Sequence, residues 1–185
     1  MIVRSKANEL LEQLLHSSGT GSSRTYYYIG LHSYSRNNRT PKPDGSHFDE
    51  PVIPTGQTFY DEDGNEVQVT VNEYQRVSLK DVIGTSSDGM VKNDNIIFFN
   101  EAEHYPWGRI THFGIFTSAT GGTPIFWGQL APNSDGTVGV NVNQYYIPIF
   151  RAGKLQIGLD QDPANPVRAS DYTDDINPSN MRPVS

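Results

Sequence analysis

WGRITHFGIF, residues 107–116, is the stretch of sequence that decides the fold. In an extended chain, successive side chains point to opposite faces. The two faces of this stretch carry different sets of residues: Thr111, Phe113 and Ile115 on one, and His112, Gly114 and Phe116 on the other. Since both faces carry bulk, we predict a central strand that is covered on both sides.

Turn signals and apolar runs on either side of this strand predict its neighbours. TGGT at 120–123 predicts a turn, and IFWGQL at 125–130 returns as the partner strand. The other predicted strands are short and lie at 25–32, 74–79, 96–99, 138–142, 145–150 and 155–159. Gly30 within the first of them indicates a bulge or close packing. A Gly/Ser/Asp-rich connection is expected at 84–94, and Ala152-Gly153 marks another turn.

A hairpin is predicted between residues 58 and 71. TFY at 58–60 and VQVTV at 67–71 flank the acidic segment 61–65. Asp63-Gly64 supplies the positive φ angles of a tight turn, and the valines alternate with polar residues. The acidic segment also resembles a calcium loop, but Gly64 falls at place four instead of six and Asn72 takes the place of the bidentate Glu. A hairpin turn is therefore the better interpretation.

Composition supports a mainly β fold. The 185 residues suffice for one domain, and 17 glycines and 12 prolines accompany 35% hydrophobic and 19% charged residues. Short strands with turns every 8 to 12 residues are typical of a sandwich. We therefore predict an antiparallel β-sandwich with long loops, preceded by one N-terminal amphipathic α-helix.

The chain divides into three parts in this prediction. Residues 1–21 form a helix and linker, in which Ser5 caps a stripe of leucines ending at Leu15. This helix packs on its own domain or on a neighbouring subunit. Residues 22–160 form the sandwich, with a long aperiodic surface loop at about 34–57, a length that favours function or contact. Residues 161–185 are rich in Pro and Asp, so we expect an extended or disordered tail, or an arm on a neighbour.

Charge and residue usage exclude several classes of protein. The formal charge is −7 and Lys and Arg do not cluster, which argues against generic nucleic-acid binding. No apolar run reaches the roughly 20 residues of a membrane span, and the start of the chain lacks a secretory signal. We therefore expect no membrane insertion and synthesis in a cytoplasm. The absence of cysteine excludes disulfides and thiol catalysis.

No catalytic, cofactor-binding or metal-ligating residue is predicted. The five histidines are His16, His32, His47, His104 and His112, and none forms a zinc-type pair at helical spacing. We expect hydrogen-bonded core or edge histidines, with metal binding as the alternative.

Carboxylates and serines give no stronger signal. Glu101 and Glu103 could share a strand face as a glycosidase pair does, but solvated edge carboxylates are the simpler interpretation. No serine occupies a nucleophile elbow, although a Ser/His/Asp set assembled by folding stays open. Tyr26, Tyr27 and Tyr28 place aromatics on both sides of one strand, as core or as a contact surface.

The order of the motifs resembles a known family. A helix with Asn8, Leu10, Leu11, Leu14 and Leu15 precedes the YIGLH strand at 28–32, which is followed by WG at 107–108, GG at 121–122, FWG at 126–128 and AG-x-L-x-I at 152–157. This order is similar to small tailed-bacteriophage virion proteins labelled tail fibre, minor tail or structural protein. This chain departs from shorter members in the 34–71 insertion and in its tail.

The resemblance implies a non-enzymatic virion structural protein on a β-sandwich, made and assembled in the bacterial host cytoplasm. It would belong to the tail or fibre attachment region or decorate the capsid, and its expected partners are other copies of itself and neighbouring virion proteins. No cofactor is expected. A receptor- or carbohydrate-binding module is the first alternative, and a hydrolase using Glu101 or Glu103 is the second.

Overall fold

The computed structural model describes residues 11–12, 27–52, 56, 58–60, 63–68, 73–85, 87 and 89–158. The predicted N-terminal helix lies outside these residues except for Leu11 and Glu12, which are helical, and the predicted tail at 161–185 lies outside them altogether. Leu11 is fully buried in the core. Within the described part of the chain, no helix is long and apolar enough to cross a bilayer.

The described chain is mainly β, and its strands pair antiparallel. In chain order the elements are β1 (Tyr28–Ser33), α2 (Tyr34–Asn37), β2 (Thr58–Tyr60), β3 (Glu66–Gln68), β4 (Val77–Ser78), β5 (Met90–Lys92), β6 (Ile97–Phe98), β7 (Gly108–Phe116), β8 (Phe126–Gln129), β9 (Val140–Val142), β10 (Ile149–Phe150) and β11 (Gln156–Gly158). Every predicted strand has a counterpart, usually shorter than expected. β5 is additional, because it lies inside the predicted connection 84–94.

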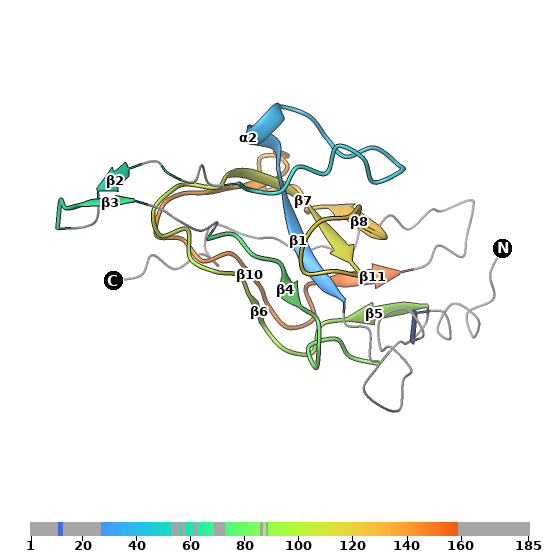
Figure 1. The fold of residues 1–185 in the computed structure, drawn as a ribbon. Coiled ribbons are helices and arrows are strands. Elements are labelled where there is room, and N and C mark those ends of the chain that lie inside the picture. Colours follow the sequence, from blue (N-terminus) through green and yellow to red (C-terminus); the bar gives the residue numbers. More distant parts are fainter. Residues whose placement is uncertain are drawn as a thin grey trace.

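β7 is the centre of a five-stranded sheet (Figure 1). The sheet order is β4-β1-β7-β8, and β9 also pairs with β7. β1 pairs with β7 from Tyr28 opposite Phe116 to Ser33 opposite Ile110, with a register shift after His32. The predicted central strand and its return partner β8 are thus confirmed.

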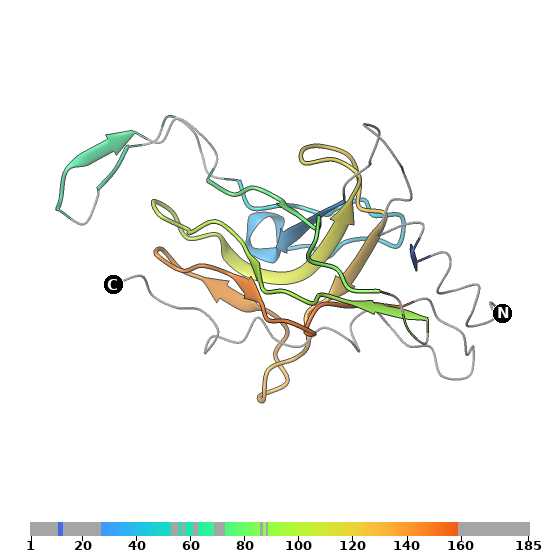
Figure 2. The ribbon, with the colours of Figure 1, turned by 90° about the horizontal axis from the view of Figure 1, so that it is seen from below.

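One face of β7 packs on two pairs of short strands, β6–β10 and β5–β11. Figure 2 shows both pairs beneath the large sheet. Phe113 meets the ring of Phe150 at 6.1 Å, and Phe150 meets Phe99 at 6.3 Å. Backbone hydrogen bonds such as Ala102 N to the Tyr146 carbonyl, 3.0 Å, extend the pairing beyond the strands. A ribbon of residues 90–102 and 145–158 therefore covers this face, but it does not form the single second sheet of the predicted sandwich.

The other face of β7 is covered by residues that were predicted to form a surface loop. Residues 34–52 begin with the single turn α2 and then pass over the sheet as a covering segment, in which Pro41, Gly45, Asp49 and Pro51 are buried. Asp49 pairs with β1: its carbonyl accepts Ser33 N at 2.8 Å, and its N–H donates to His32 Nδ1 at 2.8 Å. The loop therefore supplies a third layer.

Two glycines make room for this covering segment. Gly30 of β1 lies opposite Gly114 of β7. A Cβ at Gly30 would come within 2.6 Å of Glu50 Oε1, and one at Gly114 within 2.8 Å of the Phe48 ring. Gly30 is therefore required for close packing. Close packing was one of the two explanations that the sequence suggested for this glycine, the other being a bulge.

Gly139→Ala is expected to lower the free energy of unfolding by about 2 kcal/mol. Gly139 has φ of 97°, and an added Cβ would lie 2.3 Å from the backbone oxygen of Ile110 in β7. Gly136→Ala is the matched control, because its φ is 79° but nothing lies within 4 Å of its Cβ position. Urea unfolding of both variants measures the difference, and equal losses would contradict the predicted clash.

Candidate functional site

A network of charged and polar groups holds the covering segment in place. The Arg76 guanidinium donates to both carboxylate oxygens of Glu50, at 2.8 and 2.6 Å, and to the carbonyls of Ser118 and Gly121, each at 2.8 Å. Tyr74 donates to Glu50 at 2.8 Å while its oxygen accepts a backbone N–H from β1. Burial raises the pKa of Tyr74 well above its usual value, which keeps the hydroxyl a donor. These groups satisfy one another, so their role is structural.

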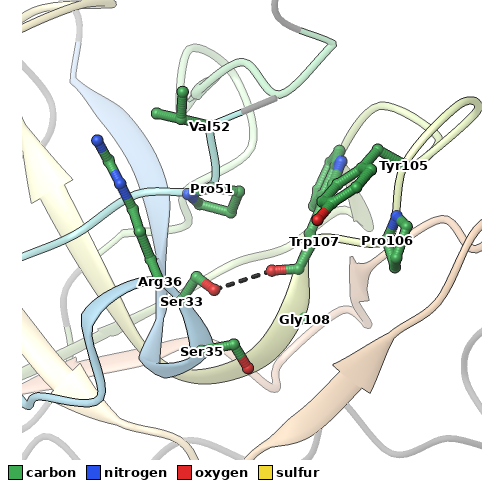
Figure 3. A pocket seen from close by; sticks show the side chains of 9 residues that line it. All are labelled: Ser33, Ser35, Arg36, Pro51, Val52, Tyr105, Pro106, Trp107 and Gly108. Atoms are coloured by element: carbon green, nitrogen blue, oxygen red, sulfur yellow. Dashed lines mark hydrogen bonds between the residues drawn. The ribbon is translucent and has the colours of Figure 1, made fainter. Parts of the chain in front are cut away.

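A groove opens beside this network (Figure 3). A cavity of about 380 Å³ adjoins a second of about 480 Å³ with which it shares Arg36, Pro51 and Val52, and each is within the size range of small-ligand sites. We call this the Arg36 groove; the first cavity is lined by Ser33, Ser35, Arg36, Pro51, Val52, Tyr105, Pro106, Trp107 and Gly108.

The lining of the first cavity combines aromatic and hydrogen-bonding groups. Tyr105 is 39% exposed at its rim. Arg36 donates to the Glu50 carbonyl at 3.0 Å, and Ser33 Oγ donates to the Trp107 carbonyl at 2.8 Å. The buried Trp107 Nε1 has no hydrogen-bond partner among the described residues. These hydrogen bonds are internal to the protein, so the groups that the groove offers to a ligand are the exposed Tyr105 side chain and the remaining N–H groups of the Arg36 guanidinium.

A second candidate surface is apolar and lies on the outer face of the β6–β10 pair. Ile96 is 44% exposed and Phe98 is 59% exposed, while their neighbours Ile97 and Phe99 are buried. Phe98 pairs directly with the half-buried Ile149 of β10. We call Ile96, Phe98 and Ile149 the apolar stripe. An exposed row of large apolar side chains on a strand pair is suited to contact with another protein.

The predicted hairpin is confirmed and forms a projection. β2 and β3 pair from Thr58 opposite Gln68 to Tyr60 opposite Glu66. Both views show this hairpin standing away from the rest of the fold (Figures 1 and 2). Tyr60 is 63% exposed, and its hydroxyl donates to Glu66 Oε1 at 3.1 Å. The acidic turn thus belongs to an arm that can reach a neighbouring molecule.

The fold brings two of the five histidines together in its interior. The rings of His32 and His112 lie 5.4 Å apart in a T-shaped contact between β1 and β7. His32 bonds backbone groups with both ring nitrogens: Nδ1 accepts from Asp49 N, and Nε2 lies 2.8 Å from the Arg39 carbonyl. Burial lowers the pKa of both histidines, that of His112 to about 4. The prediction of hydrogen-bonded core histidines is confirmed for this pair.

The other predicted candidates are dispersed. His16 and Tyr26 lie outside the described residues, and His47 lies in the covering segment. Tyr27 packs against the core, and Tyr28 is half-buried. Glu103 lies beside His104, with Glu103 Oε2 3.8 Å from His104 Nδ1. Glu73 contacts the same nitrogen. No sequence pattern pointed to Glu73, which is 31 residues from His104, or to the Arg36 groove.

A family model matches more than half of the chain. Residues 54–157 match the model of the family described as podophage GP4 fiber I protein gp80. No curated protein matches the chain significantly. The match spans β2 to most of β11, which includes the central strand, the apolar stripe and the projecting hairpin. Because it covers more than half of the chain, this β-rich protein belongs to the podophage GP4 fiber I protein gp80 family of tailed-phage tail fibre structural proteins.

Proposed function

We propose that the protein is a non-enzymatic assembly component of the virion, positioned in the tail or fibre attachment region and assembled in the host cytoplasm. Its partners are neighbouring virion proteins and other copies of itself. Membership of a fibre protein family is the observation that carries this proposal. The exposed apolar stripe and the projecting hairpin supply surfaces suited to such contacts.

The apolar stripe favours assembly because its exposure is a cost to an isolated domain. Ile96 and Phe98 alternate with two buried residues, so the strand places large apolar side chains on both of its faces. Covering such a surface removes apolar area from water, at roughly 25 cal/mol per Å². A partner that packs on β6 and β10 would also cover an open strand pair.

Phe98→Asp is expected to abolish incorporation of the protein into particles while leaving the isolated fold intact. The side chain is 59% exposed, so a charge is tolerated in the free protein but opposes burial in an interface. Complementation of a phage that lacks the protein, followed by quantification of the protein in purified particles, measures the effect. Thermal unfolding of the purified variant establishes that the fold persists.

Ile125→Asp is the matched control, because Ile125 is an exposed apolar residue of similar size that lies just before β8. It should leave incorporation unchanged. Normal incorporation of Phe98→Asp would contradict a role for the stripe. A particle map would distinguish the fibre attachment region from capsid decoration.

Receptor or carbohydrate binding is the second candidate function, because of the Arg36 groove. An aromatic side chain at the rim and hydrogen-bond donors within are suited to sugar recognition. Tyr105→Ala in the same complementation assay separates the two functions: particles that contain the protein but no longer adsorb to the host would favour receptor binding. Glu101→Gln addresses the hydrolase alternative, and it should leave every measured property unchanged.

A further inference from the structure

Three side chains with metal-ligating atoms meet on the segments that precede β4 and β7. They are Glu73, Glu103 and His104, and one ligand atom from each lies within 4.8 Å of the others. The Glu73 carboxylate contacts His104 Nδ1 and accepts the His104 backbone N–H at 3.1 and 3.2 Å. Glu103 Oε2 lies 3.8 Å from the same Nδ1, which is too long for a hydrogen bond. The imidazole nitrogen is thus the common neighbour of two carboxylates.

Within the described residues, this group has one more carboxylate than it has cationic partners. Two carboxylates face one imidazole, which carries at most one positive charge. Within the described residues, neither Glu73 nor Glu103 forms an ion pair with Lys or Arg. The Glu73 side chain is only 10% exposed and that of His104 18%, so water screens their contact poorly, whereas the Glu103 side chain is 65% exposed and remains in solvent. A divalent cation among the three ligand atoms would remove this excess of negative charge.

The backbone that carries the three ligands is fixed by other contacts. Asn100 Nδ2 donates to the Glu73 carbonyl at 2.9 Å, and Gln144 Nε2 donates to the Glu103 carbonyl at 3.0 Å. Ala102, next to Glu103, is fully buried. Its backbone N–H donates to the Tyr146 carbonyl, and its carbonyl accepts the Tyr145 N–H. Pre-positioned ligands lower the cost of binding an ion.

We propose that Glu73, Glu103 and His104 bind one divalent transition-metal ion, with Zn²⁺ as the best fit. An imidazole nitrogen with carboxylate oxygens is a common zinc ligand set, whereas Ca²⁺ and Mg²⁺ prefer oxygen ligands alone. The Glu103 side chain is 65% exposed, so water fills the remaining coordination positions. The ion ties the segment before β4 to the segment before β7, two parts of the chain about 30 residues apart.

Isothermal titration of the full-length, untagged protein with ZnCl₂, MnCl₂ and CaCl₂ tests the proposal. We expect one Zn²⁺ per chain, weaker binding of Mn²⁺ and no measurable binding of Ca²⁺. Glu73→Gln and His104→Ala should each weaken Zn²⁺ binding at least about tenfold. Glu103→Gln should weaken Zn²⁺ binding too. Of the three variants it should disturb folding least, because the Glu103 side chain is largely in solvent.

Glu101→Gln and His47→Ala are the matched controls, because they remove a nearby carboxylate and a histidine elsewhere on the fold. Both should bind Zn²⁺ as the unaltered protein does. Mn²⁺ should broaden the amide NMR signals of residues 73 and 101–105 before those of other described residues. The proposal is overturned if the protein fails to bind Zn²⁺, if all three ligand variants bind it with unchanged affinity, or if broadening centres elsewhere.

Discussion

Arg76→Met lowers the free energy of unfolding by about 3–5 kcal/mol, the expected cost of leaving one member of a buried ion pair alone. The Arg76 side chain is 3% exposed, and its loss leaves Glu50 without its cation and two carbonyls without their donors. It also removes the guanidinium that lies 3.3 Å from the centre of the Phe116 ring. Urea denaturation, monitored by far-ultraviolet circular dichroism, gives the difference in stability.

Arg39→Met is the matched control. Arg39 forms a bidentate ion pair with Asp49, and both residues lie in the covering segment. The Arg39 side chain, however, is 42% exposed. Solvent reaches the guanidinium of this pair, although the Asp49 side chain is only 11% exposed, so the loss of Arg39 should cost less than the loss of Arg76. Equal losses in the two variants would show that burial does not set the strength of these pairs. Glu50→Leu combined with Arg76→Met should cost less than the two single changes together, because no buried charge is left unpaired.

Acidification from pH 6.5 to pH 4 is expected to remove about 3 kcal/mol of stability through His112 alone. Burial lowers the pKa of His112 in the folded protein to about 4, whereas the unfolded chain titrates near 6.5. Between these values the unfolded state binds more protons, so the free energy of unfolding falls as the pH falls. The lowered pKa of His32 acts in the same direction. The pKa of Asp49, lowered to about 2, acts only below about pH 4.

Denaturant unfolding at several pH values measures this dependence. His112→Gln removes the titrating group, so the slope of stability against pH between 6.5 and 4 should become markedly smaller. His47→Gln, a histidine substitution in the covering segment, is the matched control. An unaltered slope in His112→Gln would mean that other groups govern the acid sensitivity.

Local patterns in the sequence predict the sheet well. The alternation at 107–116 and the turn at 120–123 identify β7 and β8, because neighbouring strands joined by a short turn pair with each other. Asp63-Gly64 identifies the hairpin for the same reason. These features depend only on residues that are close along the chain.

Contacts between distant segments were not predictable in this way. The covering segment 34–52 has no periodicity, and its position depends on Glu50 meeting Arg76, 26 residues away. The second layer was expected as a sheet, but its strands are only two or three residues long and form separate pairs. Residues 96–99 are all large and apolar, so both faces of this strand carry apolar side chains. Because this is a local pattern, the apolar stripe could have been predicted from the sequence. The contact between Glu73 and His104 could not, because the two residues are 31 positions apart.

The family match begins at residue 54, after β1 and after the covering segment. A polypeptide limited to 54–157 would therefore keep β7 but lose the strand that pairs along it and the side chains that shield its glycine-bearing face. Such a fragment would offer bare backbone donors and acceptors to any extended polypeptide, which promotes strand exchange and aggregation. The region that matches the family model is thus smaller than the set of segments whose contacts hold β7 in place in this protein.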